Sequence, residues 1–212
     1  MPTLSHIEAL WLQTRERLAA KRLLGDDVVA LALRCPGSTA MCCGALEAER
    51  PQWLDWRDPA LPPAAQVHAQ VYARRPDVGA SAWSAGVFGH LLANVGGVLP
   101  QVFDEQARHI GPMPAPFPAL DALATAAPGS GSVLLFGGRP LCLGITAQRL
   151  ALNVELFEKC AKAYVLAAAT GGQVRELPWW VQRIANGRLR KDQRRAAAAF
   201  AAGELPAESK GY

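Results

Sequence analysis

Residues 66–86 read QVHAQVYARRPDVGASAWSAG, and this stretch decides the fold. Pro62 and Pro63 precede it, and prolines favour the first turn of a helix. The turn Arg75-Pro76-Asp77 ends that helix, and the uncharged run Val78–Ser84 is typical of a buried strand. A helix that turns directly into a core strand predicts an α/β arrangement.

The rest of the chain alternates in the same way. A capping-box pattern, Ser5-x-x-Glu8, predicts the start of a helix that ends near Gly25. Hydrophobic periodicity and turn residues predict the remaining elements. These are strands at 28–33 and 40–43, a helix at 86–94, a short helix at 119–126 and a strand hairpin at 132–145. A long helix at 146–172 and helical stretches at 179–185 and 191–202 follow. We therefore predict one domain over residues 1–212, a three-layer α/β fold with a central, mostly antiparallel sheet flanked by helices.

Composition narrows the class of protein. Half of the 212 residues are hydrophobic, which suffices for a substantial core, and a net charge of +4 does not favour a nucleic-acid partner. The start of the chain lacks a signal pattern, and the five cysteines form no CxxC pair, so we expect free thiols and a cytoplasmic location. The stretch 78–103 has no Asp, Glu, Lys or Arg, but its glycines favour a buried strand and helix over a membrane span.

The pattern H-x-x-x-Y-x-x-R-P-D-V-G-A at 68–80, together with the hairpin and helix over 132–172, resembles the class II aldolase/adducin family. The resemblance covers roughly residues 5–172. It implies the fold described above, a divalent metal held by histidines, and a carboxylate for acid/base work. Members of this family include sugar-phosphate aldolases, an epimerase and the non-catalytic head domain of adducin, and they commonly form tetramers.

The chain departs from that family at its functional positions. The H-x-H strand of the enzymes, in which residues i and i+2 share one face, is replaced by Trp83-Ser84-Ala85, and the third histidine position holds Gly138. The position of the carboxylate is Ala64, and the phosphate-binding loop corresponds to the apolar run 29–32. We therefore expect no metal and no cofactor, and a non-catalytic homologue with a binding or structural role.

The alternative is a metal-independent lyase, epimerase or decarboxylase acting on a small hydroxy-carbonyl or sugar-phosphate-like substrate at a re-sited centre. His109 with Asp104 and Glu105 could form a relocated acid/base group near the old site, or belong to an exposed charged helix. His68, on the apolar face of its helix, is either a ligand or a core histidine.

Two further residues are candidates for ligand binding. Arg139 could bind a carboxylate or phosphate, or be a solvated turn arginine. Trp83 could fill the metal cavity or stack on a planar ligand.

The segment 173–212 is expected to be a helical extension at a subunit interface of a homo-oligomer, by the resemblance a tetramer. Its basic stretch 183–195 could bind an anionic partner, whereas a solvated helix face is the simpler interpretation. The adjacent Trp179 and Trp180 supply apolar area for packing between protomers.

Overall fold

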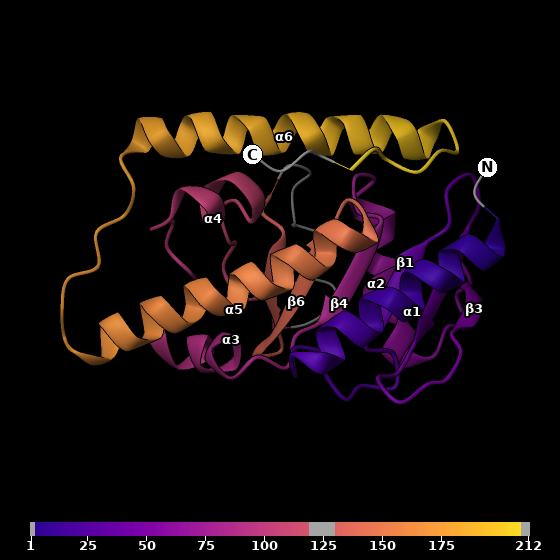
Figure 1. Cartoon of the computed structure of the whole chain (residues 1–212), viewed down its shortest axis with the longest axis horizontal. Coiled ribbons are helices and arrows are strands. Elements are labelled where there is room, and N and C mark those ends of the chain that lie inside the picture. Colours follow the sequence, from indigo (N-terminus) through magenta and orange to yellow (C-terminus); the bar gives the residue numbers. More distant parts are fainter. Residues whose placement is uncertain (1–2, 119–129, 209–212) are drawn as a thin grey trace.

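The computed structural model describes residues 3–118 and 130–208, and its helices lie around a central sheet (Figure 1). The elements run in the following order: α1 (Leu4–Ala20), β1 (Leu31–Arg34), β2 (Ala40–Gly44), β3 (Gln52–Asp55), α2 (Pro63–Arg74), β4 (Ala80–Trp83), α3 (Val87–Leu91), the 3-10 helix η1 (Leu92–Val95), α4 (Asp104–His109), β5 (Val133–Phe136), β6 (Arg139–Gly144), α5 (Ala147–Ala169) and α6 (Trp179–Ala201).

The six strands form one sheet in the order β3-β2-β1-β4-β6-β5, and every neighbouring pair is antiparallel. The predicted antiparallel α/β fold is therefore confirmed. The predicted hairpin is β5–β6, in which Phe136 pairs with Arg139 across Gly137 and Gly138. Both glycines have positive φ, 56° and 78°, as a two-residue turn that matches the strand twist requires.

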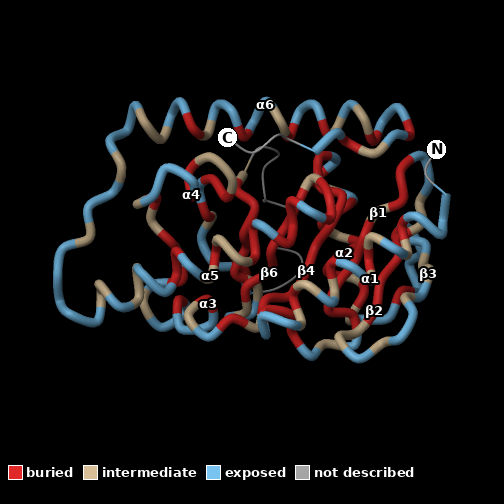
Figure 2. Tube along the Cα trace, viewed as in Figure 1, coloured by how far each residue is buried: buried red, intermediate tan, exposed pale blue. Residues whose placement is uncertain are grey.

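The two faces of the sheet carry separate apolar clusters, and the strands are the buried centre of the molecule (Figure 2). Leu31 and Leu33 of β1 point to the face covered by α1 and α5, whereas Ala32 points to the face covered by α2. Cys42 and Cys43 likewise fall on opposite faces, and all five cysteines are buried and unpaired. Two side-chain layers of this kind explain why Leu31, Ala32 and Leu33 of β1 are all hydrophobic.

Several boundaries differ from the predictions. Thr3, not Ser5, caps α1, because its hydroxyl accepts from the His6 amide at 3.3 Å. Glu8 instead accepts a hydrogen bond from the Trp53 indole of β3, at 2.8 Å. Strand β3 was missed by the sequence analysis, since it is a half-buried edge strand with an uneven apolar pattern.

The C-terminal extension also differs from the expectation. One continuous helix, α6, replaces the two predicted stretches, because Ala185, Leu189 and Ala196 present one buried stripe along its length. Figure 1 shows α6 lying across α4 and one end of the sheet. The helix predicted at 119–126 lies outside the described residues.

The uncharged stretch 78–103 folds as expected into a strand followed by short helices, β4, α3 and η1. The helical part is shorter than predicted, and His90 is exposed rather than buried. None of the helices within residues 3–118 and 130–208 is long and apolar enough to cross a membrane.

Gly79 lies where the end of α6 meets the sheet. A Cβ atom there would lie 2.5 Å from the Phe200 ring and 2.6 Å from the Ile145 carbonyl oxygen, closer than packed atoms approach. The glycine of the R-P-D-V-G-A pattern therefore lets Phe200 of the extension pack against the start of β4.

We predict that Gly79→Ala lowers the free energy of unfolding by about 1–3 kcal/mol, because the added methyl group would overlap the Ile145 carbonyl oxygen and the Phe200 ring. Gly187→Ala is the matched control: this exposed α6 glycine has no neighbour near its Cβ position, so the change should add about 0.5–1 kcal/mol of helix stability. Urea denaturation of both variants measures the difference. Equal stability of the two would show that Phe200 does not need this gap.

Candidate functional site

Trp83 ends β4 on the face of the sheet that α2 covers, and only 6% of it is exposed. Its ring meets the His68 ring edge-on at a centroid distance of 6.4 Å and lies 5.9 Å from the Phe136 ring. The Arg139 guanidinium covers it, 5.0 Å from the ring centre. The indole is thus enclosed by an imidazole, a phenyl ring and a cation.

Arg139 is fixed by a bidentate ion pair with Asp27, with N–O distances of 2.6 and 2.7 Å. The hydrogen bonds to Asp27 raise the pKa of Arg139 above its usual value, so the guanidinium stays charged. Its charge is already matched by a carboxylate. An anionic ligand at Arg139 would therefore compete with Asp27 for this charge.

The loop that carries Asp27 is tied to β4. The Gly25 amide donates to the Trp83 carbonyl at 3.0 Å, and Leu24 forms an isolated bridge with Ser84. A side chain at Gly25 would begin 2.9 Å from the Asp27 carboxylate and 3.3 Å from the Trp83 Cβ. The missing side chain at Gly25 thus lets the carboxylate reach across to Arg139.

The remaining positions singled out by the resemblance also lack functional groups. Ala85 is half-buried, and its amide donates to the Leu23 carbonyl at 3.1 Å. Gly138 is exposed in the β5–β6 turn, and Ala64 is half-buried in the first turn of α2.

His68 is completely buried and fully hydrogen-bonded. Its Nε2 lies 3.0 Å from the Val29 carbonyl, and its Nδ1 lies 2.7 Å from the Ser81 hydroxyl. A carbonyl only accepts, so Nε2 carries the proton and Nδ1 accepts from Ser81. Burial lowers the pKa of His68 to about 4, and the ring is neutral at pH 7. His68 is a core histidine that joins α2 to the sheet.

The donor set around Trp83 does not fit the divalent metal that the resemblance implies. Indole and methyl side chains offer no ligating atom, and both nitrogens of the neighbouring His68 are already bonded. Within residues 3–118 and 130–208, no group of three His, Cys, Asp or Glu side chains is arranged to hold a metal ion. We therefore derive no metal-dependent step.

The candidate acid/base group lies at the other end of the sheet, so the expectation that it stands near Trp83 is wrong. The His109 carbonyl accepts from Ser132, which precedes β5, whereas Trp83 pairs with Leu141 close to the β5–β6 turn. The short helix α4 is held against α5 and α6, which places His109 beside Arg149.

His109 and Glu105 share the lining of a cavity of about 450 Å³, whereas Asp104 faces Trp180 in a smaller groove. His109 Nδ1 lies 2.9 Å from a guanidinium nitrogen of Arg149. Burial and then the charge of Arg149 lower the pKa of His109 to about 4. Glu105, on the exposed side of α4, forms a 3.5 Å ion pair with Lys159.

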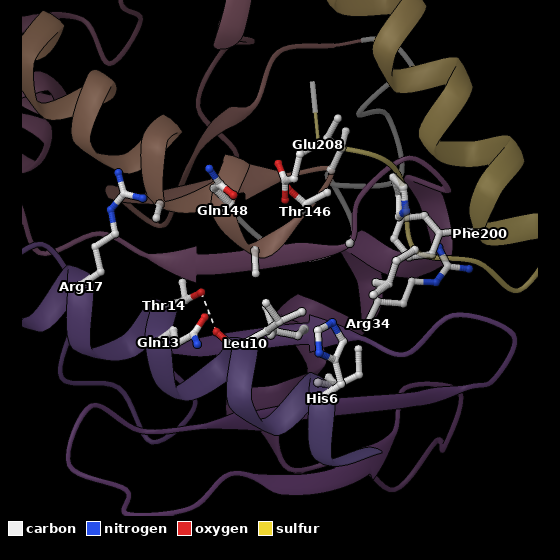
Figure 3. A pocket seen from close by; sticks show the side chains of 18 residues that line it. His6, Leu10, Gln13, Thr14, Arg17, Arg34, Thr146, Gln148, Phe200 and Glu208 are labelled. Atoms are coloured by element: carbon white, nitrogen blue, oxygen red, sulfur yellow. Dashed lines mark hydrogen bonds between the residues drawn. The ribbon is translucent and has the colours of Figure 1, made fainter. Parts of the chain in front are cut away.

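A second cavity, of about 480 Å³, opens at the same end of the sheet (Figure 3). Arg34 at the end of β1, Gly79 before β4 and Phe200 of α6 line one side of it. One face of α1, the start of α5 and the segment after α6 line the rest. The sequence analysis did not single out Arg34 or Asp27, since neither belongs to a local motif and each acquires its surroundings only through the fold.

The basic stretch of α6 points to solvent. Arg183, Arg188 and Lys191 are exposed, whereas Asp192 faces α4 and pairs with Arg108 at 2.7 Å. This arrangement agrees with a solvated helix face.

Solved structures of similar shape are class II aldolases and related proteins. YgbL from Klebsiella pneumoniae, assigned provisionally as an aldolase, epimerase or decarboxylase, superposes with a TM-score of 0.73 at 15% identity, over 87% of this chain and 100% of its own. An L-fuculose 1-phosphate aldolase gives 0.72 at 16%, over 90% and 98% of the two chains. An aldolase II superfamily protein from Pseudomonas syringae gives 0.70 at 14%, over 95% and 93%.

The chain has a class II aldolase-like fold. The expected fold and the resemblance on which it was based are thereby confirmed at the level of structure. No protein-family profile matches the sequence, and no curated protein is similar to it in sequence.

The buried His68 predicts a pH dependence for this aldolase-like domain. Its pKa is about 4 when folded and about 6.5 when unfolded, so between these values the unfolded chain binds a proton that the folded chain excludes. The contribution of His68 to the free energy of unfolding should therefore be fully present above about pH 6.5. It should be lost as the pH drops toward 4, which lowers the free energy of unfolding by a few kcal/mol.

Urea unfolding of wild type and His68→Gln at about pH 7 and about pH 5 isolates this contribution from other acid effects. Glutamine can donate to the same carbonyl but does not titrate, so the variant should lose less stability on acidification. Equal losses in both proteins would mean that His68 is not the group responsible.

Proposed function

We propose that this chain is a non-catalytic protein of class II aldolase-like fold, with a binding or structural role. The observation that carries the proposal is the enclosed Trp83, with the Asp27–Arg139 ion pair closing over it. In the metal-dependent reaction a Lewis acid polarises the substrate carbonyl, and that ion needs ligands with lone pairs at these positions. Trp83 and Ala85 supply none.

The energetics support the same interpretation. Burying a large apolar side chain contributes on the order of 1.5–3 kcal/mol, and the ion pair adds up to about 1 kcal/mol because Arg139 is partly exposed. A site filled in this way stabilises the domain without a ligand.

We predict that the purified protein retains much less than one zinc, manganese or iron ion per chain after growth with added metals and dialysis against a weak chelator. Elemental analysis by mass spectrometry measures this. The matched comparison is the double variant Trp83→His/Ala85→His, which places two imidazoles two residues apart and should retain more metal than the wild type. A stoichiometric metal ion in the wild type would overturn the proposal.

A second candidate function, a metal-independent lyase, epimerase or decarboxylase, is favoured by one observation: Glu105 and His109 line the same 450 Å³ cavity. A histidine with a pKa of about 4 is neutral at pH 7 but a weak base, which disfavours this alternative. Turnover of hydroxy-aldehydes, keto acids or sugar phosphates that disappears in His109→Gln would establish it.

Two further features belong to the proposal. The exposed Trp179, Trp180 and Ile184 at the start of α6 would pack between protomers of a homo-oligomer, with the tetramer of the family as the expected form. Light scattering of the wild type and of Trp179→Ser/Trp180→Ser would test the interface. The free, buried cysteines are in keeping with a cytoplasmic location.

A further inference from the structure

We infer that the cavity between α1, α5 and the end of α6 binds a small organic monocarboxylate with an apolar body. The inference deepens the proposed function and rests on it, because it gives a site and a ligand class to a protein proposed to bind rather than to catalyse. The site lies at the end of the sheet opposite Trp83, where β1 ends and β4 begins (Figure 3).

Arg34 is the centre of the site. Its guanidinium is held between two rings, 5.3 Å from the centre of Trp56 and 5.0 Å from that of Phe200. Two rings at these distances stabilise the cation through their π faces, and the N–H groups of the guanidinium are the donors that a planar acceptor would bond.

Among the described residues, the Arg34 N–H groups have few hydrogen-bond acceptors. One Arg34 nitrogen makes a long contact, 3.4 Å, to the Pro76 carbonyl, and no carboxylate among the described residues lies within 4 Å of the group. Burial lowers the pKa of Arg34, yet an arginine remains charged at neutral pH. A half-buried cation with most of its five donors unused is suited to a carboxylate, which can accept two parallel hydrogen bonds.

The other cation in the cavity is already neutralised. Arg17 donates to both oxygens of Glu155, at 2.7 and 3.1 Å, and Lys21 joins the same carboxylate at 2.9 Å. Figure 3 shows Arg17 at the end of the cavity far from Arg34. Among the described residues that line the cavity, Arg34 is therefore the one guanidinium without a carboxylate partner, which favours one carboxylate over a phosphate dianion. Arg57 lies near Arg34, 4.8 Å from the centre of the same Trp56 ring, but does not line the cavity.

The body of the ligand would lie on an apolar floor. Ile7 and Leu33 are buried there, Ala151 of α5 completes the surface, and the volume of about 480 Å³ is in the range of small-molecule sites. Glu208, from the segment after α6, also lines the cavity beside Thr146 (Figure 3). Its carboxylate would repel a second anionic group, so the far end of the ligand should be neutral.

The extension completes the site. Phe200, Leu205 and Pro206 lie within the C-terminal part of the chain and form one wall. Because Gly79 has no side chain, the Phe200 ring can pack against it. This contact holds the end of α6 in place and with it the ring over which the Arg34 guanidinium lies.

The test uses phenylacetate as the probe, with phenylacetamide as its neutral isostere and inorganic phosphate as the alternative anion. In calorimetric titrations of the full chain, phenylacetate should bind, and the amide and phosphate should bind at least about tenfold more weakly. Arg34→Gln should lower phenylacetate affinity at least about tenfold, whereas Arg139→Gln, at the other end of the sheet, should leave it unchanged.

Amide NMR shifts in the wild type locate the site without any variant, which keeps the test decisive even if Arg34→Gln does not fold. Shifts concentrated at Arg34, Gly79 and Phe200 would support the inference. No binding, shifts at Arg139 and Gly138 instead, or equal affinity for acid and amide would overturn it. The two proposals can fail separately. A stoichiometric metal ion in the purified protein would contradict the proposed function, whereas the phenylacetate titrations test only the carboxylate site.

Discussion

A buried chain of hydrogen bonds between α2 and the sheet is the constraint on which the rest of this structure depends. His68 and Tyr72 lie one helical turn apart and reach the sheet together, with the Ser81 hydroxyl between them, 2.7 Å from the imidazole and 3.2 Å from the phenol. Each also bonds a carbonyl of the β1 region, those of Val29 and Ala32. Ser81 has one hydroxyl proton, which it gives to His68, and Tyr72 gives its own to the Ala32 carbonyl. Because buried polar groups without such partners are costly, these bonds favour one position of α2 on the sheet.

The position of α2 determines which groups surround Trp83. With His68 occupied by Val29 and Ser81, its imidazole cannot turn toward a ligand, and its edge becomes part of the wall against which the indole packs. The buried Arg75–Asp77 pair, at 2.7 Å, fixes the turn that joins α2 to β4. These contacts among the chain's own residues thus hold α2 and β4 together within the aldolase-like fold.

The sequence predicted the parts of the fold that carry local signals. The β5–β6 hairpin follows from two adjacent glycines between apolar runs, and α5 follows from its long helical period and its Thr146 cap. The edge strand β3 has no such pattern. The Asp27–Arg139 pair joins residues 112 positions apart, and the stacking of Arg34 on Phe200 depends on how α6 folds back, so neither could be read from spacing.

The two ends of the sheet therefore differ in how the charge of an arginine is neutralised. At the Trp83 end, a cation lies over the ring but is matched by Asp27, so the surface is both filled and neutralised. At the opposite end, Arg34 also lies over aromatic rings, and a cavity of about 480 Å³ opens beside it. A half-desolvated guanidinium without a carboxylate partner among the described residues raises the free energy of the empty site, and an anion that supplies a carboxylate lowers it. Binding at Arg34 would then stabilise the fold where the extension meets the sheet, which joins ligand occupancy to the packing of α6.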